Sequence, residues 1–310
     1  MMKIFMLLLI CPVLSFAQLK FNGKIIDAKT KQPIPFVNLE NFRTKTGTQS
    51  NQDGVFSLNL PNGKQSDTLK ISCVGYLEKS ISNLASAENV IYELSPVVFQ
   101  LNEVSVGNTK YEEKEVGIIK RNGSNITFFN QMIQRPGLQR AVYMKSDGVS
   151  IAFIKTIWFY MGNDMFDAPF RIRIYEDEKG LPGKDLLNKS VEFNARKKNS
   201  WNSFDILSYN LIVPPNGFWV AVEWIKNDKY AAQSISFDIK NADGTRKKGK
   251  TFTYYGPEII QKFDTDYGLT YTKYLASKYW NKDYSTKGTG ENKRQTNVDL
   301  LIKATILVAQ

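Results

Sequence analysis

The stretch that decides the fold runs from residue 23 to residue 76 and holds four motifs: Gly23-Lys-Ile-Ile-Asp27, Lys31-Gln-Pro-Ile-Pro-Phe-Val37, Gln52-Asp-Gly-Val-Phe-Ser-Leu58 and Val74-Gly-Tyr76. Apolar and polar residues alternate over 56–60 and again over 69–73, with the turn-forming run Pro61-Asn-Gly-Lys64 between them. A period of two residues is typical of a half-buried strand, and Asp53-Gly54 is typical of a hairpin turn. The stretch therefore predicts a small β-domain.

The order of these motifs resembles the carboxypeptidase regulatory-like domain, also called the peptidase-associated, transthyretin-like domain. The residues that carry the resemblance are Gly23, Ile25, Asp27, Pro33, Pro35, Val37, Gly47, Ser50, Asp53, Gly54, Phe56, Leu69, Ser72, Gly75 and Tyr76. Cys73 stands where the family often has an aromatic residue. The resemblance implies a transthyretin-like β-sandwich over residues 18–106, without catalytic residues of its own, in an envelope protein of Gram-negative bacteria.

The first 17 residues have the pattern of a signal peptide. Lys3 supplies a positive charge, residues 4–14 are apolar, and Ser15-Phe-Ala17 places small residues before the expected cut between Ala17 and Gln18. The apolar run is shorter than the ~20 residues of a membrane span, so we expect no transmembrane segment in the mature chain. An exported protein of the periplasm, the cell surface or the medium is predicted. Cys73 would then be the only cysteine, and we expect it to be a buried, inert thiol.

The second half of the chain also has the pattern of strands. Residues 107–137 contain a charge run and turn residues, and we expect a linker there with one short strand or helix at 126–133. Beyond it, over residues 138–310, strands are expected at 151–160, 170–175, 218–225 and 300–308, a loop at 181–183 and an ambiguous segment at 271–280. The sequence therefore predicts an all-β chain whose second, larger domain is a jelly-roll-like β-sandwich.

This half resembles a C-terminal β-sandwich module that occurs beside regulatory-like domains in exported bacterial proteins. The resemblance rests on Phe170-Arg-Ile-Arg-Ile-Tyr175, Pro182-Gly183, Phe204-Asp205, Leu207-Ser-Tyr-Asn210 and Phe218-Trp-Val-Ala-Val-Glu-Trp224. It implies a fold and no activity.

The chain contains no histidine, which excludes several kinds of active site. A histidine-ligated zinc peptidase and a Ser-His-Asp triad are both impossible within it. No Walker-type or Rossmann glycine motif is present, and Asn51-Gln-Asp53 does not have EF-hand spacing, so we expect Asp53 to cap a turn. No cofactor and no metal site are predicted.

The chain is basic, with a formal net charge of +11, and its charges are scattered. Nucleic acid is not expected outside the cytoplasm. Two interpretations remain: attraction to anionic envelope glycans, or a surface that keeps the protein in solution.

Carboxylates and tryptophans are the remaining candidates for a site. A carboxylate pair could support glycoside hydrolysis, and the candidates by residue type are Asp164, Asp167, Glu176, Asp177, Glu178 and Glu223. Glu223 lies within an apolar strand, where an acid must be paired, exposed at one face or functional. Trp219 and Trp224 are five residues apart on the same strand, so at most one of them can face the core. We therefore take Trp219, Trp224 and Glu223 as candidate ligand contacts.

These patterns favour a non-catalytic binding or assembly module at the bacterial cell envelope. Envelope glycans or an outer-membrane protein are the expected partners. The alternatives are a carboxylate-based glycoside hydrolase and an accessory subunit of an outer-membrane complex.

Overall fold

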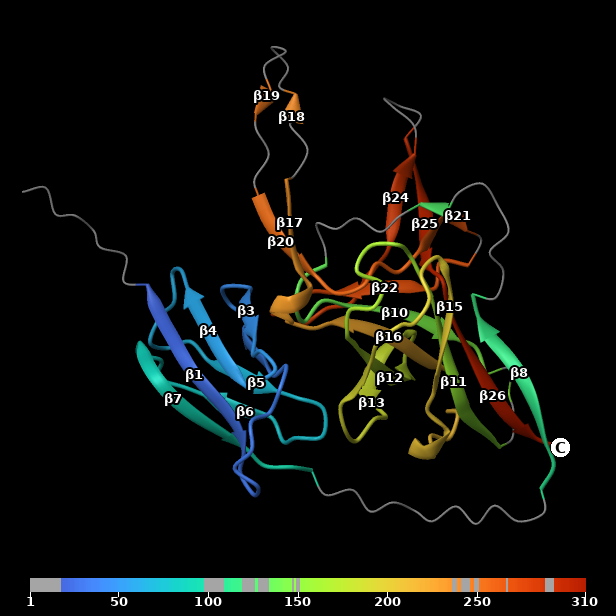
Figure 1. Cartoon of the computed structure of the whole chain (residues 1–310), viewed down its shortest axis with the longest axis horizontal. Helices are drawn as coiled ribbons and strands as arrows, with labels where there is room; N and C mark the ends of the chain where they lie inside the picture. Colours follow the sequence, from blue (N-terminus) through green and yellow to red (C-terminus); the bar gives the residue numbers. More distant parts are fainter. Residues whose placement is uncertain are drawn as a thin grey trace, which may run out of the picture.

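The computed structural model describes residues 18–97, 109–118, 126–127, 134–146, 148, 151–235, 239–240, 246–247, 251–265, 267–287 and 293–310. These residues form two β-domains that lie side by side (Figure 1). The regular elements among them are strands and two 3-10 turns, η2 (Leu207–Tyr209) and η3 (Asp228–Tyr230). The predicted all-β class is therefore confirmed.

The first domain is a sandwich of two small sheets. Its strands are β1 (Leu19–Asp27), β2 (Asn38–Asn41), β3 (Thr46–Gln49), β4 (Val55–Leu60), β5 (Leu69–Ser72), β6 (Lys79–Ile81) and β7 (Ala87–Leu94). One sheet has the order β4-β1-β7 and the other β3-β2-β5-β6. Alternate residues of β4 and β5, including Phe56, Leu58, Leu69 and Ile71, are buried in the core between the sheets. The period of two in the sequence thus marks the buried face correctly.

The Asp53-Gly54 turn does not form the hairpin that its sequence predicts, because β3 and β4 belong to different sheets. The side chain that caps it is that of Asn51, not Asp53: Asn51 Oδ1 accepts hydrogen bonds from the backbone N–H groups of Asp53 (3.0 Å) and Val55 (2.9 Å). Gly54 has a φ of +73°, and a Cβ atom there would lie 2.6 Å from the carbonyl oxygen of Ile25. The glycine is needed because the chain passes close against β1 as it crosses from one sheet to the other.

Asp27 and Tyr76, which belong to the first and last motifs of the opening stretch, meet in the first domain. The Tyr76 hydroxyl donates to Asp27 Oδ2 at 3.0 Å, while Asp27 Oδ1 accepts from the backbone N–H groups of Lys29 (2.7 Å) and Thr30 (2.8 Å). The hydrogen bond from Thr30 is the main reason that the pKa of Asp27 is lowered, and burial together with the bond to Asp27 raises the pKa of Tyr76 to about 12. Asp27 therefore ties the β1 end to the Val-Gly-Tyr motif.

We expect Asp67 to make the first domain acid-sensitive. Arg43 forms an ion pair with the Asp67 carboxylate and Lys64 N donates to it, and these contacts lower the pKa of Asp67 from 3.8 to about 2. A lowered pKa in the folded state contributes stability above the ordinary value and loses it as the pH falls through about 2. Chemical denaturation of the wild type and of Asp67→Asn should therefore show the wild type more stable near neutral pH. The difference should shrink as the pH approaches 2, and a pH-independent difference would contradict this role.

The second domain contains the remaining strands. They are β8 (Tyr111–Gly117), β9 (Ile126–Thr127), β10 (Gln139–Met144), β11 (Ala152–Met161), β12 (Phe170–Glu178), β13 (Leu181–Asp185), β14 (Val191–Phe193), β15 (Ser200–Asp205), β16 (Phe218–Trp224), β17 (Ala231–Ile235), β18 (Ile239–Lys240), β19 (Arg246–Lys247), β20 (Thr251–Tyr255), β21 (Gln261–Thr265), β22 (Thr270–Lys273), β23 (Asn281–Lys282), β24 (Tyr284–Lys287), β25 (Arg294–Leu300) and β26 (Ile302–Ala309).

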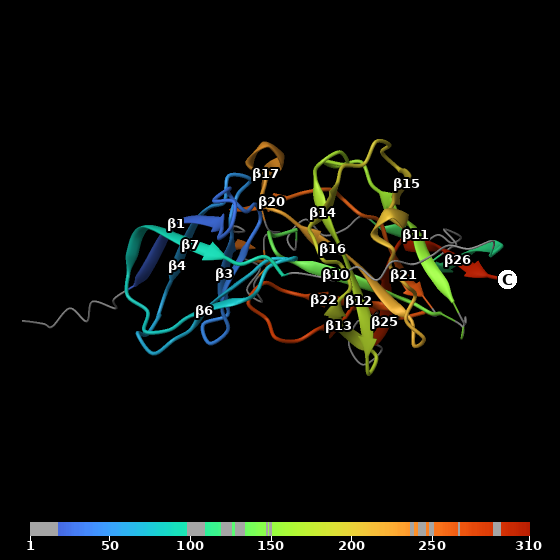
Figure 2. The ribbon, with the colours of Figure 1, turned by 90° about the horizontal axis from the view of Figure 1, so that it is seen from below.

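Two sheets of the second domain enclose its core. A seven-stranded sheet has the order β13-β12-β16-β10-β22-β23, with β14 also paired to β12, and a four-stranded sheet has the order β15-β11-β26-β8. The chain crosses from β10 to β11 in the other sheet, returns for β12, β13 and β14, and crosses again to β15 before β16, as in a jelly-roll-like sandwich (Figures 1 and 2). Phe159, Phe170 and Phe204 pack edge to face between them, with ring centroids 5.1–5.9 Å apart. A third sheet, β24-β25-β21-β9, and the ribbon β17-β20 extend from this sandwich.

Several segments differ from the sequence-based expectation. Residues 111–117, which we placed in a linker, form β8 and pair with β26 along its whole length, on the far side of the second domain from β7 (Figure 1). The predicted loop at 181–183 is part of β13, which pairs with β12 through a turn at 179–180. Of the expected element at 126–133, residues 126–127 form β9 and the others lie outside the described residues. The ambiguous segment at 271–280 is the end of β22 followed by turns.

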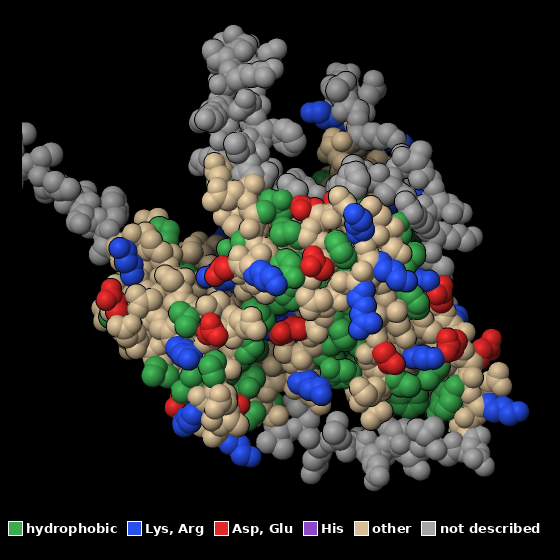
Figure 3. All heavy atoms as spheres, viewed as in Figure 1, with side chains coloured by type: hydrophobic (Ala, Val, Ile, Leu, Met, Phe, Trp, Pro, Cys, Tyr) green, Lys and Arg blue, Asp and Glu red, His purple; other side chains and the backbone are tan. Residues whose placement is uncertain are grey.

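The surface of the molecule mixes both signs of charge. On the face seen in Figure 3, lysine and arginine side chains alternate with aspartate and glutamate, and no large single-sign patch is present on the described part of that face. No helix among the described residues is long and apolar enough to cross a membrane.

Candidate functional site: the cavity between the two domains

A row of polar side chains crosses the outer face of the seven-stranded sheet. Arg171 of β12 lies opposite Glu223 of β16, and Glu223 lies opposite Gln139 of β10. Gln139 in turn lies opposite Lys273 of β22. Their neighbour Val222 points into the core, so this row faces away from the core and toward the first domain.

Glu223 is the centre of this row and is completely buried, with 0% of its surface exposed. Its carboxylate is 2.9 Å from Arg173 Nη1 and 3.5 Å from Arg171 Nη1. It also accepts hydrogen bonds from two amides of the first domain, Asn38 Nδ2 (3.1 Å) and Gln49 Nε2 (3.2 Å). Burial opposes its charge, but the two arginines outweigh burial and lower the pKa of Glu223, so it stays ionised.

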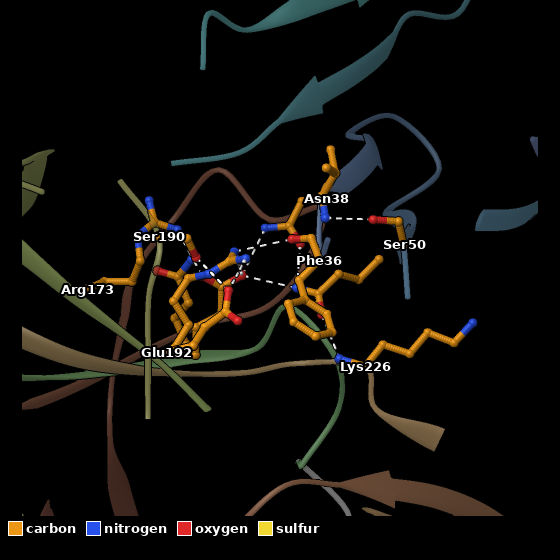
Figure 4. Close-up of polar contacts among 12 residues, drawn as sticks. Phe36, Asn38, Ser50, Arg173, Ser190, Glu192 and Lys226 are labelled. Carbon is orange, nitrogen blue, oxygen red and sulfur yellow. Dashed lines mark hydrogen bonds and ion pairs between the residues drawn. The ribbon is translucent and has the colours of Figure 1, made fainter. Parts of the chain in front are cut away.

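Two backbone hydrogen bonds extend the joint, by which we mean the buried polar contacts that link the two domains around Glu223. Lys226 N donates to Gln49 Oε1 at 2.7 Å (Figure 4). Ala276 N donates to Glu40 Oε1 at 2.8 Å. Asn38, Glu40 and Gln49 all come from the paired strands β2 and β3. The outer face of the sheet β3-β2-β5-β6 of the first domain is therefore held against the outer face of the seven-stranded sheet by buried polar contacts.

Backbone conformation also adapts at this interface. Phe36 is a buried, bulky residue with a φ of +54°, and its carbonyl oxygen accepts a hydrogen bond from Arg171 Nη1 at 3.2 Å. Such a conformation persists only when the surroundings impose it. Gly75 of the Val-Gly-Tyr motif has a φ of +84°, and a Cβ there would lie 2.6 Å from the carbonyl oxygen of Asn188. The first domain is thus shaped to fit the second one closely.

A cavity of about 400 Å³ lies beside this joint and has walls from both domains. Its size is within the usual range for small-molecule sites, and domain interfaces are a common place for such sites. The first domain contributes, among others, Asn38, Glu40, Lys70, Ser72, Cys73, Tyr76 and Glu78; the second contributes Gln139, Arg171, Arg173, Tyr175, Asp185, Lys273 and Tyr274.

Two charged groups in the cavity wall are partly desolvated. Burial raises the pKa of Glu40, and burial lowers the pKa of Lys273. The Lys273 ammonium lies 6.0 Å from the centre of the Trp280 ring. The charges of Glu40 and Lys273 attract each other and partly offset the effect of burial on both pKa values.

The three residues proposed from the sequence as ligand contacts are all buried. Trp219 and Trp224 point to opposite faces of the sheet, as their spacing predicts, but they are only 2% and 0% exposed. Trp224 is in the core, whereas Trp219 packs between Tyr143 and Tyr271 with centroids 5.1 and 5.2 Å away. Neither ring offers a face to a ligand, and Glu223 joins the domains instead of lining an open site. All three residues make structural contacts in the described part of the protein, and their role as ligand contacts stays a prediction.

The cavity brings together residues that sequence analysis did not single out. Glu40 and Lys273 are more than 200 residues apart in the chain and belong to different domains. The only local signal is that Glu40 lies in the buried strand Asn38–Asn41, where an acid is unusual.

Cys73 has a raised pKa because it is largely desolvated, and it lines the cavity as a free thiol. Its partial burial agrees with the inert thiol that we expected. Across the described ranges no group of three or more histidine, cysteine, aspartate or glutamate residues is placed to hold a metal ion. The expected cleavage site between Ala17 and Gln18 lies at the edge of the described residues, and Ala17 is outside them.

Comparison with known proteins gives one family match. Residues 21–106 match the model of the CarboxypepD_reg-like domain. No curated protein matches the chain. Among solved structures, the chain is similar to the cysteine protease and lectin-like domains of Cwp84, a surface layer associated protein of Clostridium difficile, with 12% identity and a TM-score of 0.28.

That likeness covers 61% of this chain and only 37% of the other, and its low score carries no argument about fold or function. The family match is different in kind, because it coincides with the sandwich of β1 to β7 and with the motifs of the opening stretch. Residues 21–106 of this chain are a CarboxypepD_reg-like domain.

Proposed function

We propose that this protein is an exported, non-catalytic binding module of the bacterial cell envelope, and that it holds carbohydrate in the cavity between its two domains. The cavity of about 400 Å³, with walls from both domains, is the observation that carries the proposal. Buried contacts around Glu223 hold those walls in place, and a pre-formed site loses less entropy on binding.

The chemistry of the wall suits a sugar. The wall contains hydroxyl, amide and charged groups such as Ser72, Asn38 and Arg173, and it also contains Tyr175 and Tyr274. Sugars present many hydroxyl groups and also apolar ring faces, so they need both kinds of contact. Tyr274 is 46% exposed, which leaves part of its ring accessible from solvent.

Several of the carboxylates considered as candidates for catalysis in the sequence analysis form hydrogen bonds or ion pairs with other residues. Asp164 accepts a hydrogen bond from the Tyr254 hydroxyl at 3.0 Å, and Asp177 accepts one from Trp219 Nε1 at 2.9 Å. Glu223 is enclosed by arginines. These hydrogen bonds and ion pairs support a binding role over the alternative of a carboxylate-based glycoside hydrolase.

The proposal is tested by a thermal-shift screen of the purified protein against envelope polysaccharides and their oligosaccharides. A ligand that binds only the folded state stabilises it by about 2.7 kcal/mol at a hundred times its dissociation constant. Tyr274→Ala should weaken binding by several-fold because an aromatic face is lost. Tyr279→Ala is the matched control, since this tyrosine is 74% exposed and does not line the cavity.

The other outcomes separate the alternatives. Turnover of a bound glycan would replace the binding module with a hydrolase. Binding to an outer-membrane protein fraction, without any binding to polysaccharide, would favour an accessory subunit of an envelope complex. Equal loss of binding in both tyrosine variants would remove the cavity as the site.

A further inference from the structure

We propose that a second cavity, between the strands β3 and β20, binds the phosphate group of an organic phosphomonoester, and that Lys45, Arg135 and Lys226 hold this phosphate. The inference goes beyond the carbohydrate site proposed for the first cavity and does not depend on it. Residues of both domains form the wall of the second cavity, so the packing of the domains creates it.

The second cavity has a volume of about 530 Å³. It lies where β3, an edge strand of the first domain, approaches the ribbon β17-β20 of the second domain. These elements are side by side in both ribbon views (Figures 1 and 2). Three basic side chains and no acidic side chain line this cavity.

The three basic residues come from separate segments of the chain. Lys45 lies in the turn between β2 and β3, Arg135 precedes β10, and Lys226 follows β16. Within the described part of the chain, none of these side chains forms an ion pair, a hydrogen bond or a ring contact. An anion in the cavity would therefore attract three cations that no carboxylate of the protein neutralises at close range.

Acidic groups behind and beside the wall reduce this positive charge without cancelling it. Burial, and after it the charge of Asp228, raises the pKa of Tyr255, so the Asp228 carboxylate acts on the wall. Glu40 on the neighbouring strand attracts Lys273 instead, and Glu223 is paired with two arginines. When Asp228 is counted against the three cations, two positive charges remain.

A phosphomonoester matches this remaining charge, because it carries about −1.5 to −2 near pH 7. The guanidinium of Arg135 suits phosphate in particular, since it can donate two parallel hydrogen bonds to phosphate oxygens. The hydroxyl groups of Thr48 and Thr253 also line the cavity and have no hydrogen-bond partner in the described ranges. They can donate to the remaining phosphate oxygens.

The backbone that carries two of the cations is fixed by hydrogen bonds. Lys226 N donates to Gln49 Oε1 at 2.7 Å, and the carbonyl oxygen of Arg135 accepts from Leu138 N at 3.0 Å. Gln49 and Leu138 are themselves part of the cavity wall. A wall with a pre-formed backbone loses less entropy when a ligand binds.

The cavity is larger than free phosphate requires, and its size is within the usual range for small-molecule sites. Tyr255 and Leu275 provide apolar surface beside the basic groups, and Tyr274 belongs to the walls of both cavities. Free phosphate would leave this apolar surface unused. The geometry therefore favours a phosphate group attached to a sugar or a polyol over inorganic phosphate.

The experiment is isothermal titration of the purified full chain with glucose 6-phosphate, glycerol 3-phosphate, glucose and inorganic phosphate. We expect glucose 6-phosphate to bind at least about ten-fold more tightly than glucose, which corresponds to one charge-assisted hydrogen bond. Inorganic phosphate should bind more weakly than the better organic phosphate. The order of the two organic phosphates distinguishes a sugar phosphate from a polyol phosphate such as that of a lipid headgroup.

Variants then locate the phosphate. Arg135→Gln should weaken binding of the better organic phosphate by at least about ten-fold, and Lys45→Gln should weaken it by a smaller factor, because a lysine makes no bidentate contact. Lys198→Gln is the matched control, since Lys198 is exposed and lines neither cavity. Arg135 and Lys45 are exposed as well, so all three variants should keep the melting temperature of the wild type.

Three results would overturn the inference: glucose binding as tightly as its phosphate, inorganic phosphate binding as tightly as both organic phosphates, or wild-type affinity in Arg135→Gln. Each of them would leave the proposed function standing, because polysaccharide binding in the first cavity is measured with different ligands. Conversely, phosphate-dependent binding without any binding of polysaccharide would support the second cavity and contradict the proposed function.

Discussion

Replacing Glu223 with alanine is expected to lower the free energy of unfolding by about 3–5 kcal/mol, because the change removes the one fully buried anion that two buried arginines share. Arg171 and Arg173 both depend on this carboxylate, and Asn38 and Gln49 of the first domain lose their acceptor as well. Chemical denaturation measures the loss. We expect the contact between the domains to weaken together with the second domain itself.

Glu192→Ala is the matched control for that experiment. Glu192 accepts a longer hydrogen bond from the same Arg171, and its side chain is 29% exposed. An ion pair of this kind contributes less than about 1 kcal/mol, so the control should differ little from the wild type. A Glu223→Ala protein as stable as the control would show that Glu223 is not the joint between the domains.

Trp224→Ala is expected to destabilise the protein by about 3–5 kcal/mol as well, but through packing. The indole is fully buried in the core of the second domain, and its Nε1 donates to the Pro257 carbonyl at 3.0 Å. The substitution creates a large cavity and removes this bond. Thermal or chemical denaturation followed by near-ultraviolet circular dichroism would measure the effect.

This variant also separates a structural role from a ligand role. If Trp224 only supports the fold, glycan binding should fall in proportion to the unfolded fraction and recover at lower temperature. Tyr279→Ala, which removes an exposed ring, should change the stability by no more than about 0.5 kcal/mol. A fully folded Trp224→Ala protein that has lost glycan binding would restore the role that we first predicted for this tryptophan.

The long, apolar strands could be predicted from sequence because the order of apolar and polar residues along each strand indicates which side chains are buried. Phe218–Trp224 is apolar on both faces apart from Glu223, and it is indeed the central strand β16 between β12 and β10. Alternation at 170–175 likewise indicated β12. In each case the local pattern matches the burial that the fold imposes, because a strand presents alternate residues to each face.

Turn residues were less informative about strand pairing. Asp53-Gly54 does mark a tight turn, but the strands on either side of it lie in different sheets. A turn specifies a local reversal of the chain, whereas the partner of a strand depends on the whole sheet. The charged run at 110–115 was misread for a related reason: β8 is an edge strand whose exposed residues can be polar, so it lacks an apolar signal.

By itself, the sequence determined the all-β class, the regulatory-like domain over residues 21–106 and the absence of histidine chemistry, since each of these follows from composition or from local pattern. Only the tertiary structure decided that Glu223 is a buried joint and that Glu40 and Lys273 face one cavity. These residues come from strands of two domains, and their burial and charge environment arise only when β2 and β3 pack against the outer face of the seven-stranded sheet. Residue type and spacing along a chain carry no information about contacts over such a distance in sequence.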